Sequence, residues 1–434
     1  MKKSIIFLST LTLAGILISC KEEHVKMPWE DDLEKKHAEQ QGAGQLPTAT
    51  VGQVMPRWTE GCLDIHLINS GRGECIFYIM PDGTTLLIDA GETKTDKTTS
   101  VPQRPNENTR PYMVDASYIK HFIPAGKNAI DYFMACHFHI DHIGAPAMAT
   151  ETSENGYKLA GITALYNEVP FNHLIDRAYP TYTEDKTIPA IDSGFIEDYM
   201  AFVKWGTTNK KFDGTRFEVG KEQITMLNDA DKYKNFSIFN ICGNGNVWVV
   251  DASGAGGTVT NYSTNGGNPS SCGVHIHYGK FDYIACGDLV SSPQNAVSNY
   301  VKAAIPVNGL DAFKAHHHLS ANSWGSGMQK NNFHPRVIVN QNFTNYQPDY
   351  GLVNALNSGI FDNASVKWEN DFFTTNLCQD QQNTYPDIAS KIKGSNGHIV
   401  LRVAPDTEQF YVYLLDDGDL IYRIKNIYGP YTSR

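Results

Sequence analysis

Three apolar, strand-like runs of this chain each end in side chains that can bind metal ions. AIDYFMAC leads into HFHIDH at 137–142, FDYIAC leads into Gly-Asp at 287–288, and LDAFKA leads into three histidines at 316–318. Functional groups commonly stand on loops at the ends of rigid strands. If the three groups act together, the fold must align these strand ends along one edge, and this requirement restricts the architecture more than any other feature.

The spacing within HFHIDH favours a metal ion over other chemistry. Residues i and i+2 of an extended segment point the same way, so His137 and His139 can bind one ion. Asp141 and His142 can then serve a second ion beside the first. A pair of ions needs a bridging carboxylate from elsewhere in the chain, and Asp288 fits this role.

Two alternatives remain for the histidine cluster: a histidine-rich turn without metal, and a structural rather than catalytic metal site. Structural zinc sites usually close with cysteine ligands and leave no open position. Cys136 is adjacent, but its side chain should point away from His137 and into the core. Apart from Cys20, the cysteines are scattered without a CxxC pair, which predicts mostly buried free thiols.

The remaining pattern predicts an α/β fold. The segment CLDIHLINSGRGECIFYIMPDGTTLLIDAG at 62–91 predicts three strands, joined by a glycine-rich turn and a Pro-Asp-Gly turn. Further strand-like runs, interrupted by helical stretches, favour two mixed β-sheets with helices outside. Residues 346–434 carry no functional motif, and they either complete the second sheet or form an appended subdomain.

The first twenty residues predict export. Lys2 and Lys3 precede an apolar run that is too short to span a bilayer comfortably. The run ends in Leu-Ile-Ser-Cys, which resembles the lipobox of bacterial lipoprotein signal peptides. This resemblance implies a signal peptide at 1–19, a lipid on Cys20 that anchors the protein to the membrane, and a place in the bacterial cell envelope, on its periplasmic or cell-surface side. The polar residues 20–55 would then tether the folded domain. The alternative is an ordinary cleaved secretion signal with a chance cysteine.

The formal net charge of −11 argues against a nucleic-acid partner. A strongly acidic surface repels phosphate backbones on average, although a local basic groove can still exist. Nucleic acid is therefore a disfavoured partner that the charge does not exclude. The charge favours a small or surface-attached substrate instead.

Four segments resemble the metallo-β-lactamase superfamily of binuclear metallohydrolases. HFHIDHIG is similar to the HxHxDH signature, INSGRGECIFYIMPDGTTLLIDAG to the opening strands of that fold, and ACGD to the segment with the bridging aspartate. FKAHHHLS resembles a stretch of the subgroup that contains the competence nuclease domain and phosphorylcholine esterase. The resemblance covers roughly residues 60–345. It implies a hydrolase domain at 56–345 with a four-layer αββα sandwich, two mixed sheets between outer helices.

The resemblance also implies a role for each ligand. His137 and His139 would bind the first metal, and Asp141 and His142 would bind the second. Asp288 would bridge the two ions, which are expected to be zinc, with manganese as the alternative. The metal ligands implied in this way are His137, His139, Asp141, His142, Asp288 and His317, with His318 as the alternative to His317. Asp141 would also accept a proton or orient the attacking water.

This sequence departs from the superfamily at one ligand of the first metal. Members usually add a third histidine before the bridging aspartate, whereas this chain has NPSSCGVHIHY, with Asn268 and Ser271 in that region. The third ligand is therefore an unusual side chain, a water, or absent. His275 and His277 alternate with apolar residues and are expected to face solvent. Asp89 would lie beneath the metals and orient a ligand, or merely cap its turn.

The expected reaction is metal-assisted hydrolysis. The histidine-rich segment favours a phosphodiesterase that acts on a small or surface-attached phosphodiester or ester. A lactonase, or another ester or amide hydrolase, is the second enzyme hypothesis. The non-enzyme hypothesis is a ligand-binding lipoprotein with a degenerate metal site. The missing third histidine is the main support for this hypothesis.

Overall fold

The computed structural model describes residues 45–182, 190–250, 256–260, 267–305, 309–323, 333–357 and 370–434. The predicted signal peptide, Cys20 and the tether up to residue 44 lie outside these ranges. Residues 42–434 belong to one compact unit. None of the described helices has the length and apolar character needed to cross a membrane.

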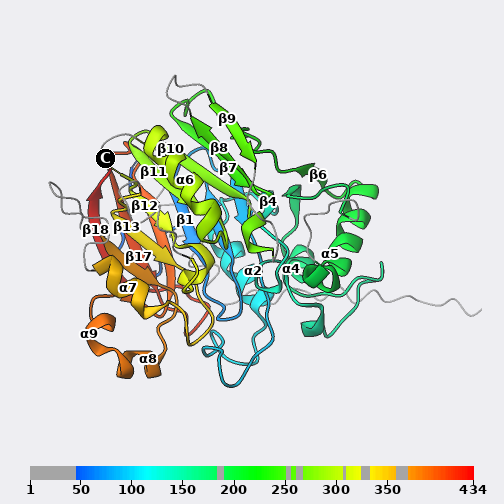
Figure 1. Ribbon diagram of the computed structural model, residues 1–434, viewed down its shortest axis with the longest axis horizontal. Coiled ribbons are helices and arrows are strands. Elements are labelled where there is room, and N and C mark those ends of the chain that lie inside the picture. The colour runs from blue at the N-terminus through cyan, green and yellow to red at the C-terminus, as the bar shows by residue number, and fades with distance from the viewer. Residues whose placement is uncertain are drawn as a thin grey trace, which may run out of the picture. The chain divides into compact units, whose positions relative to one another are not determined.

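The first sheet is mixed, has nine strands and contains the strands predicted near the N-terminus (Figure 1). Its order is β18 (Ile424–Thr432), β17 (Gln409–Leu415), β16 (His398–Val403), β1 (Leu63–Leu67), β2 (Ile76–Ile79), β3 (Thr85–Ile88), β4 (Ile130–Ala135), β5 (Phe171–Asp176) and β6 (Asp213–Arg216). The strands from β18 to β3 are antiparallel, and β3 to β6 are parallel. The three strands expected at 62–91 are thus present as β1, β2 and β3.

The second sheet is also mixed and nine-stranded, and it contains the other two strands that lead into predicted ligands. Its order is β15 (Gly394–Ser395), β14 (Asp371–Thr374), β13 (Val337–Asn340), β12 (Ala312–Lys314), β11 (Phe281–Ala285), β10 (Gly273–Tyr278), β7 (Phe236–Gly243), β8 (Asn246–Val250) and β9 (Gly256–Thr260). The strands from β11 to β15 are parallel, and β10, β7, β8 and β9 are antiparallel to their neighbours.

The C-terminal residues contribute to both sheets. β14 and β15 extend the second sheet, whereas β16, β17 and β18 return to the first sheet and pair through β16 with β1. Figure 1 shows these red and orange strands beside the blue β1. The described strands after residue 370 are thus part of the two sheets of the sandwich.

The described helices lie outside the two sheets or at their edges. They are α2 (Pro111–Phe122), α3 (Ile140–Ile143), α4 (Ile162–Glu168), α5 (Ala190–Thr208), α6 (Ser291–Ala304), α7 (Tyr350–Asn357), α8 (Gln379–Thr384) and α9 (Pro386–Ala389), with short 3-10 turns η1 (Pro146–Met148), η2 (Asn268–Ser270) and η3 (His316–Leu319). Proline opens α2, where its fixed φ suits the first turn and its missing N–H costs nothing.

Three buried apolar clusters correspond to the three interfaces of a four-layer sandwich. The first joins the outer face of the first sheet to α2, α4 and α5, the second lies between the sheets, and the third joins the second sheet to α6 and α7. β1 illustrates the alternation: Leu63, Ile65 and Leu67 belong to the cluster between the sheets, while His66 packs against Tyr118 of α2. The αββα architecture is therefore confirmed.

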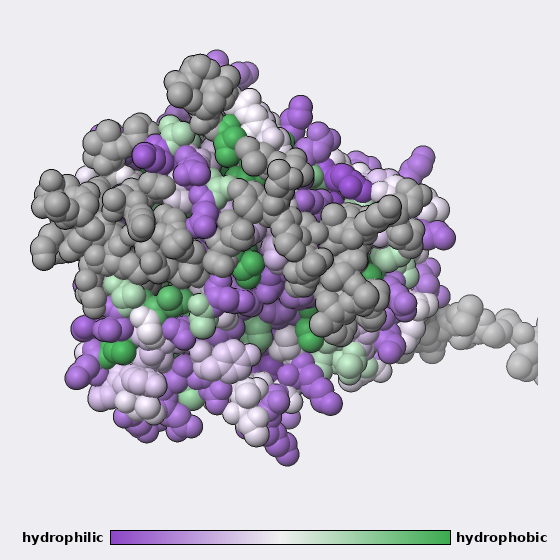
Figure 2. Space-filling view, viewed as in Figure 1, coloured by the Kyte–Doolittle hydropathy of each residue, from purple (hydrophilic) through white to green (hydrophobic). Residues whose placement is uncertain are grey.

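The apolar surface of the described residues is mainly inside these clusters. Figure 2 shows hydrophobic residues as separate spots among hydrophilic ones on the face drawn. The large hydrophobic side chains that the structure gives as exposed are spread along the chain: Val51, Met113, Leu227, Tyr346 and Tyr385. The seven cysteines between 62 and 378 are free, and six of them are buried, as expected for core thiols.

Candidate metal centre

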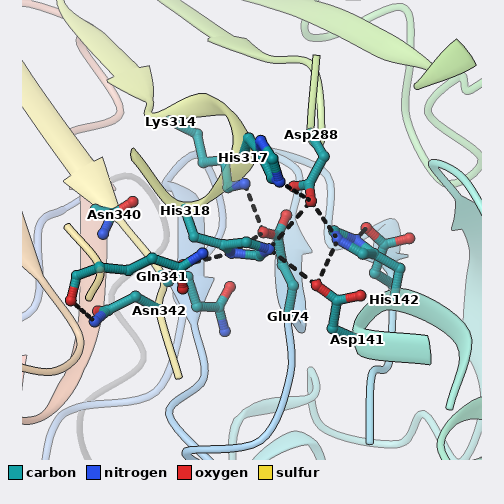
Figure 3. A network of polar contacts seen from close by, with 12 residues as sticks. Glu74, Asp141, His142, Asp288, Lys314, His317, His318, Asn340, Gln341 and Asn342 are labelled. Carbon is teal, nitrogen blue, oxygen red and sulfur yellow. Dashed lines mark hydrogen bonds and ion pairs between the residues drawn. The ribbon is translucent and has the colours of Figure 1, made fainter. Parts of the chain in front are cut away.

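The predicted ligands stand at the C-terminal ends of parallel strands in both sheets. HFHIDH follows β4 in the first sheet, whereas Asp288 and the histidines of η3 follow the neighbouring strands β11 and β12 in the second. Because the two sheets face each other, these strand ends meet (Figure 3). The convergence expected from the three strand-plus-ligand segments is present in the structure.

Asp288 lies at the centre of the cluster. Its Oδ2 atom is 3.2 Å from Nε2 of His142 and 3.2 Å from Nε2 of His318. The same oxygen lies 4.0 Å from Nε2 of His137 and 3.9 Å from Nε2 of His317. One carboxylate oxygen thus faces imidazole nitrogens from both sheets, which is the position a bridging ligand requires.

The structure places His318, rather than His317, among the carboxylates. His318 Nε2 lies 3.1 Å from Oδ2 of Asp141, and the His318 ring is buried. The His317 Nε2 atom instead accepts a hydrogen bond from Asn268 Nδ2 at 3.1 Å, while its Nδ1–H donates to Asn322 Oδ1 at 2.7 Å. The geometry therefore favours the alternative ligand of the sequence analysis over its first choice.

Backbone conformation explains this difference between neighbouring histidines. His317, His318 and Leu319 all have positive φ, at 47°, 53° and 54°. Three successive residues in the left-handed region are rare for side chains with a Cβ atom. This turn carries His318 inwards, and the side chain of His317 is left at the edge, where it contacts η2.

The buried ring nitrogens of His142 and His318 are oriented for ligation. His142 Nδ1–H donates to Oδ2 of Asp89 at 2.7 Å, and His318 Nδ1–H donates to the carbonyl of Gln341 at 2.8 Å. A proton on Nδ1 leaves the Nε2 lone pair free to bind a cation. Asp89 also accepts the Cys136 amide N–H at 2.8 Å, so it fixes both the strand end and the ring.

Glu74 and Lys314 belong to the site, although the sequence analysis did not identify them. Glu74 is grouped with His142, Asp288 and His318, and the ligand atoms of all four lie within 4.8 Å of one another. Lys314 Nζ forms an ion pair with Oε2 of Glu74 at 2.5 Å, and both side chains are buried. The signal in the sequence is a charged residue next to or within an apolar strand, in GRGECIFYI and DAFKAH.

His139 is less closely grouped with the other predicted ligands than His142 and His318 are. The rings of His137 and His139 are adjacent, with centroids 4.6 Å apart. Cys136 Sγ lies 3.1 Å from His137 Nδ1, so the expectation that its side chain points away from His137 is wrong. Within the described ranges, His139 joins none of the groups whose ligand atoms lie within 4.8 Å of one another. The segment that replaces the usual third histidine does reach the site, because Asn268 contacts His317 and Ser271 Oγ accepts the Asp288 N–H at 3.2 Å.

The donor set fits divalent cations. His137 Nε2, His142 Nε2 and Asp288 Oδ1 are buried and have no hydrogen-bond partner among the described residues. Buried polar atoms are rarely left unpaired, so these two nitrogens and one oxygen within one cluster indicate a missing positive partner. Imidazole and carboxylate are also the ligands that zinc-like ions prefer.

The local charges lead to the same conclusion. Burial lowers the pKa of His137 well below its ordinary value, which favours the neutral ligand form. Burial opposes protonation of His318 as well, but Asp288, Asp141 and Glu74 raise its pKa to about 10. Burial would raise the pKa of Asp141, but His142 and His318 hold it well below its usual range. The carboxylates thus attract positive charge to the point between them.

The remaining histidines that the sequence analysis considered lie elsewhere. His173 on β5 is partly exposed and forms an ion pair with Asp213. His275 and His277 lie on the outer face of β10, but His275 is only 7% exposed, so the expectation that it faces solvent is wrong. Its ring is covered by Tyr300 of α6, which a strand pattern cannot reveal.

Neither a protein-family model nor a curated protein matches this chain. Several solved structures do match. CmlA, a diiron beta-hydroxylase from Streptomyces venezuelae, is 11% identical over 60% of this chain and 35% of that chain, with a TM-score of 0.29. Unliganded yeast PDE1 is 10% identical over 76% and 96%, with a TM-score of 0.33. AbOPH, a hydrolase in the beta lactamase superfamily, is 10% identical over 57% and 75%, with a TM-score of 0.26. This chain therefore spans about a third of CmlA. At these TM-scores, the function has to be inferred from the chain's own residues.

Proposed function

We propose that this chain is a metal-dependent hydrolase of the metallo-β-lactamase superfamily that cleaves a phosphodiester. The observation that carries the proposal is the buried contact of Asp288 with histidines from both sheets at 3.2 Å. The HxHxDH signature, the αββα architecture and the strand-end position of every ligand agree with it. We further propose a centre of two divalent ions, zinc before manganese.

Each side chain has a distinct task in this proposal. His137 and His139 would hold the first ion, and Asp141, His142 and His318 the second, with Asp288 between them. Bound divalent ions would supply a water of near-neutral pKa as the nucleophile and polarise the oxygen of the scissile group. Asp141 lies at the edge of the cluster, where its carboxylate can orient that water or accept its proton.

Residues behind the ligands keep them in place. Asp89 and the Gln341 carbonyl fix the tautomers of two histidines, and Lys314 neutralises Glu74. Gln341 is itself held, because its side-chain amide donates to the carbonyl of Cys75 at 3.1 Å. Supporting contacts of this type commonly change metal affinity or activity by about 10- to 100-fold when they are removed.

The proposed substrate is small or attached to a surface. The chain carries a net charge of −11, which opposes the binding of a long polyanion. The resemblance of Leu-Ile-Ser-Cys to a lipobox supports a lipid anchor on Cys20 and a place in the bacterial cell envelope. From such a position, the enzyme would reach soluble phosphodiesters and those of the envelope itself.

Hydrolysis of bis(p-nitrophenyl) phosphate tests the proposal. The full chain, purified in detergent, is assayed with zinc and with manganese and compared with Asp288→Asn. We expect Asp288→Asn to lower kcat/KM by at least about 100-fold, because it removes the carboxylate that the histidines share. Asp213→Asn, which alters an exposed carboxylate on β6, is the matched control and should retain full activity.

Three other results would change the interpretation. A folded protein that carries metal, hydrolyses lactones and leaves the phosphodiester intact would indicate the lactonase or ester-hydrolase alternative. A protein that binds no metal and shows no turnover would favour a ligand-binding lipoprotein. Equal activity in wild type and Asp288→Asn would contradict the proposed centre itself.

A further inference from the structure

A second group of histidines and a carboxylate lies on the outer face of the second sheet. His275 and His277 occupy alternate positions of β10 and so share one face. Asp282 of β11 is directly opposite His277 in the strand pairing. The strand register therefore brings two imidazoles and one carboxylate together without any loop.

The distances within this group suit one cation. Oδ1 of Asp282 lies 2.7 Å from Nε2 of His275 and 2.9 Å from Nδ1 of His277. Ligands that bind zinc at about 2.0–2.1 Å in its usual tetrahedral arrangement are themselves about 3.3 Å apart. A single ion could thus replace the two ring protons now shared with the carboxylate if the three side chains separate by roughly half an ångström.

Other residues orient the three groups. His275 Nδ1 accepts a hydrogen bond from the Tyr300 hydroxyl of α6 at 2.9 Å, so Nε2 is aimed at Asp282. The backbone N–H of Asp282 donates to Oδ2 of Asp311 at 3.0 Å, which fixes the start of β11. Support behind the ligands is typical of metal-binding histidines and carboxylates.

The group opens onto a cavity of about 610 Å³. His275, His277 and Asp282 form part of its wall, together with Trp248 and Tyr300. Three protein ligands leave coordination positions open, and here those positions would face the cavity. The ion could therefore carry water or a small ligand as well.

This group is separate from the candidate metal centre. Asp282 stands at the start of β11, and Asp288 lies six residues later, beyond the end of the strand. At about 3.3 Å per residue, this spacing corresponds to roughly 15–20 Å along the chain. The group also lies on the helix-covered face of the sheet, whereas the candidate centre lies between the sheets.

We propose that His275, His277 and Asp282 form a second binding site for a divalent transition-metal ion, of the zinc type, with open positions towards the cavity. Two histidines and one carboxylate on a single face are a common donor set for such ions. The proposal concerns residues outside the candidate hydrolase centre, so it stands or falls independently of the hydrolase function.

Counting bound zinc tests this proposal. The full chain is stripped with a chelator, dialysed against buffer with zinc, separated from free metal and analysed for zinc per chain. We expect Asp282→Asn and His277→Ala each to lose one equivalent while keeping the phosphodiesterase activity of the wild type. His173→Ala changes a histidine of β5 that pairs with Asp213, and this matched control should lose none.

Measurements in the Asp288→Asn variant separate zinc bound at this site from zinc bound at the candidate centre. In Asp288→Asn, zinc that remains should come from the outer site, and it should disappear in the double variant Asp288→Asn/Asp282→Asn. His277 is 42% exposed, so His277→Ala keeps the test valid if Asp282→Asn does not fold. Unchanged zinc content in both Asp282→Asn and His277→Ala would overturn the proposal, whatever the activity assay shows.

Discussion

At the scale of single residues, His317 and His318 are the two alternatives for one ligand of the candidate metal centre, and the structure treats them differently. His318 Nε2 is 3.1 Å from Asp141 and 3.2 Å from Asp288, whereas the His317 Nε2 already accepts a hydrogen bond from Asn268. We expect His318→Ala to weaken zinc binding at the centre by at least about 100-fold, because it removes a direct ligand. His317→Ala should weaken it less than about tenfold. Competition with a chromogenic zinc chelator measures both constants.

The neighbouring substitution is itself the control in this experiment. The two variants remove the same side chain from adjacent positions of η3, so unspecific effects on the turn are matched. A larger loss of zinc affinity in His317→Ala than in His318→Ala would show that His317 is the ligand after all.

The residue scale also shows where sequence reasoning stops. Spacing and resemblance identified His137, His142 and Asp288, because their order follows strand ends. They did not distinguish His317 from His318, since that choice depends on three positive φ angles in one turn. Glu74 and Lys314 stand 240 positions apart, and only the folded chain shows that they form a buried pair.

At the scale of elements, the contact between the end of β3 and α3 holds the HFHIDH segment in place. The amide of Glu74 donates to the carbonyl of Asp141 at 2.8 Å, and the amide of Ala90 donates to that of His142 at 2.8 Å. Gly91 fits only because it has no side chain: a Cβ atom there would lie 1.8 Å from the carbonyl oxygen of Asp141. The HFHIDH segment is thus in backbone contact with the residues that follow β3 and with Glu74, which precedes β2.

Gly91→Ala should therefore damage the candidate centre without altering any ligand. We expect the free energy of unfolding to fall by about 1–3 kcal/mol, as in other overpacked sites, and zinc affinity to fall with it. Urea denaturation and zinc titration measure the two effects. Gly257→Ala is the matched control, because a Cβ atom at that position meets nothing within 4 Å. If both variants behave like the wild type, the tight contact does not constrain the ligands.

Strands with a local sequence pattern could be predicted. The strands that they pair with in the sheets could not always be predicted. β1 to β4, β11 and β12 follow from alternation, apolar runs and turn residues. The pairing of β16 with β1 has no local signature, because both strands are ordinary apolar segments far apart in the sequence. For the same reason, the sequence left open whether residues 346–434 join the sandwich or stand beside it.

At the scale of the whole molecule, a buried ion pair links the C-terminal strand β16 to the first strand, β1. Arg402 of β16 lies opposite Asp64 of β1 in the strand register, with Nε–Oδ1 and Nη2–Oδ2 distances of 2.7 and 2.6 Å. Both side chains are fully buried. Removing one partner of such a pair leaves the other charge buried and unpaired, at a cost of about 3–5 kcal/mol.

Asp64→Asn should therefore lower the free energy of unfolding by about 3–5 kcal/mol at neutral pH, measured by urea denaturation. Glu168→Gln, which breaks an exposed pair with Lys120 at 2.6 Å, is the control and should cost less than about 1 kcal/mol. Equal and small effects of the two variants would mean that the buried pair does not fasten the strands.

The same pair predicts a dependence on pH. Burial alone would raise the pKa of Asp64, but the Arg402 guanidinium lowers it below its ordinary value. A depressed folded-state pKa contributes stability above the unfolded value of about 3.9, and this contribution is lost as the pH falls through the folded value. The difference in stability between wild type and Asp64→Asn should therefore shrink below about pH 4.

The pairing of β1 with β16 also affects how the chain is made. Leu63 finds its partner Val403 only after almost the entire polypeptide has left the ribosome. Until then, one edge of β1 stays open, and the apolar layer between the sheets lacks the side chains of β16 and β17. Contacts that span so much sequence form slowly. The first sheet is therefore completed only after residues 398–432 have been translated.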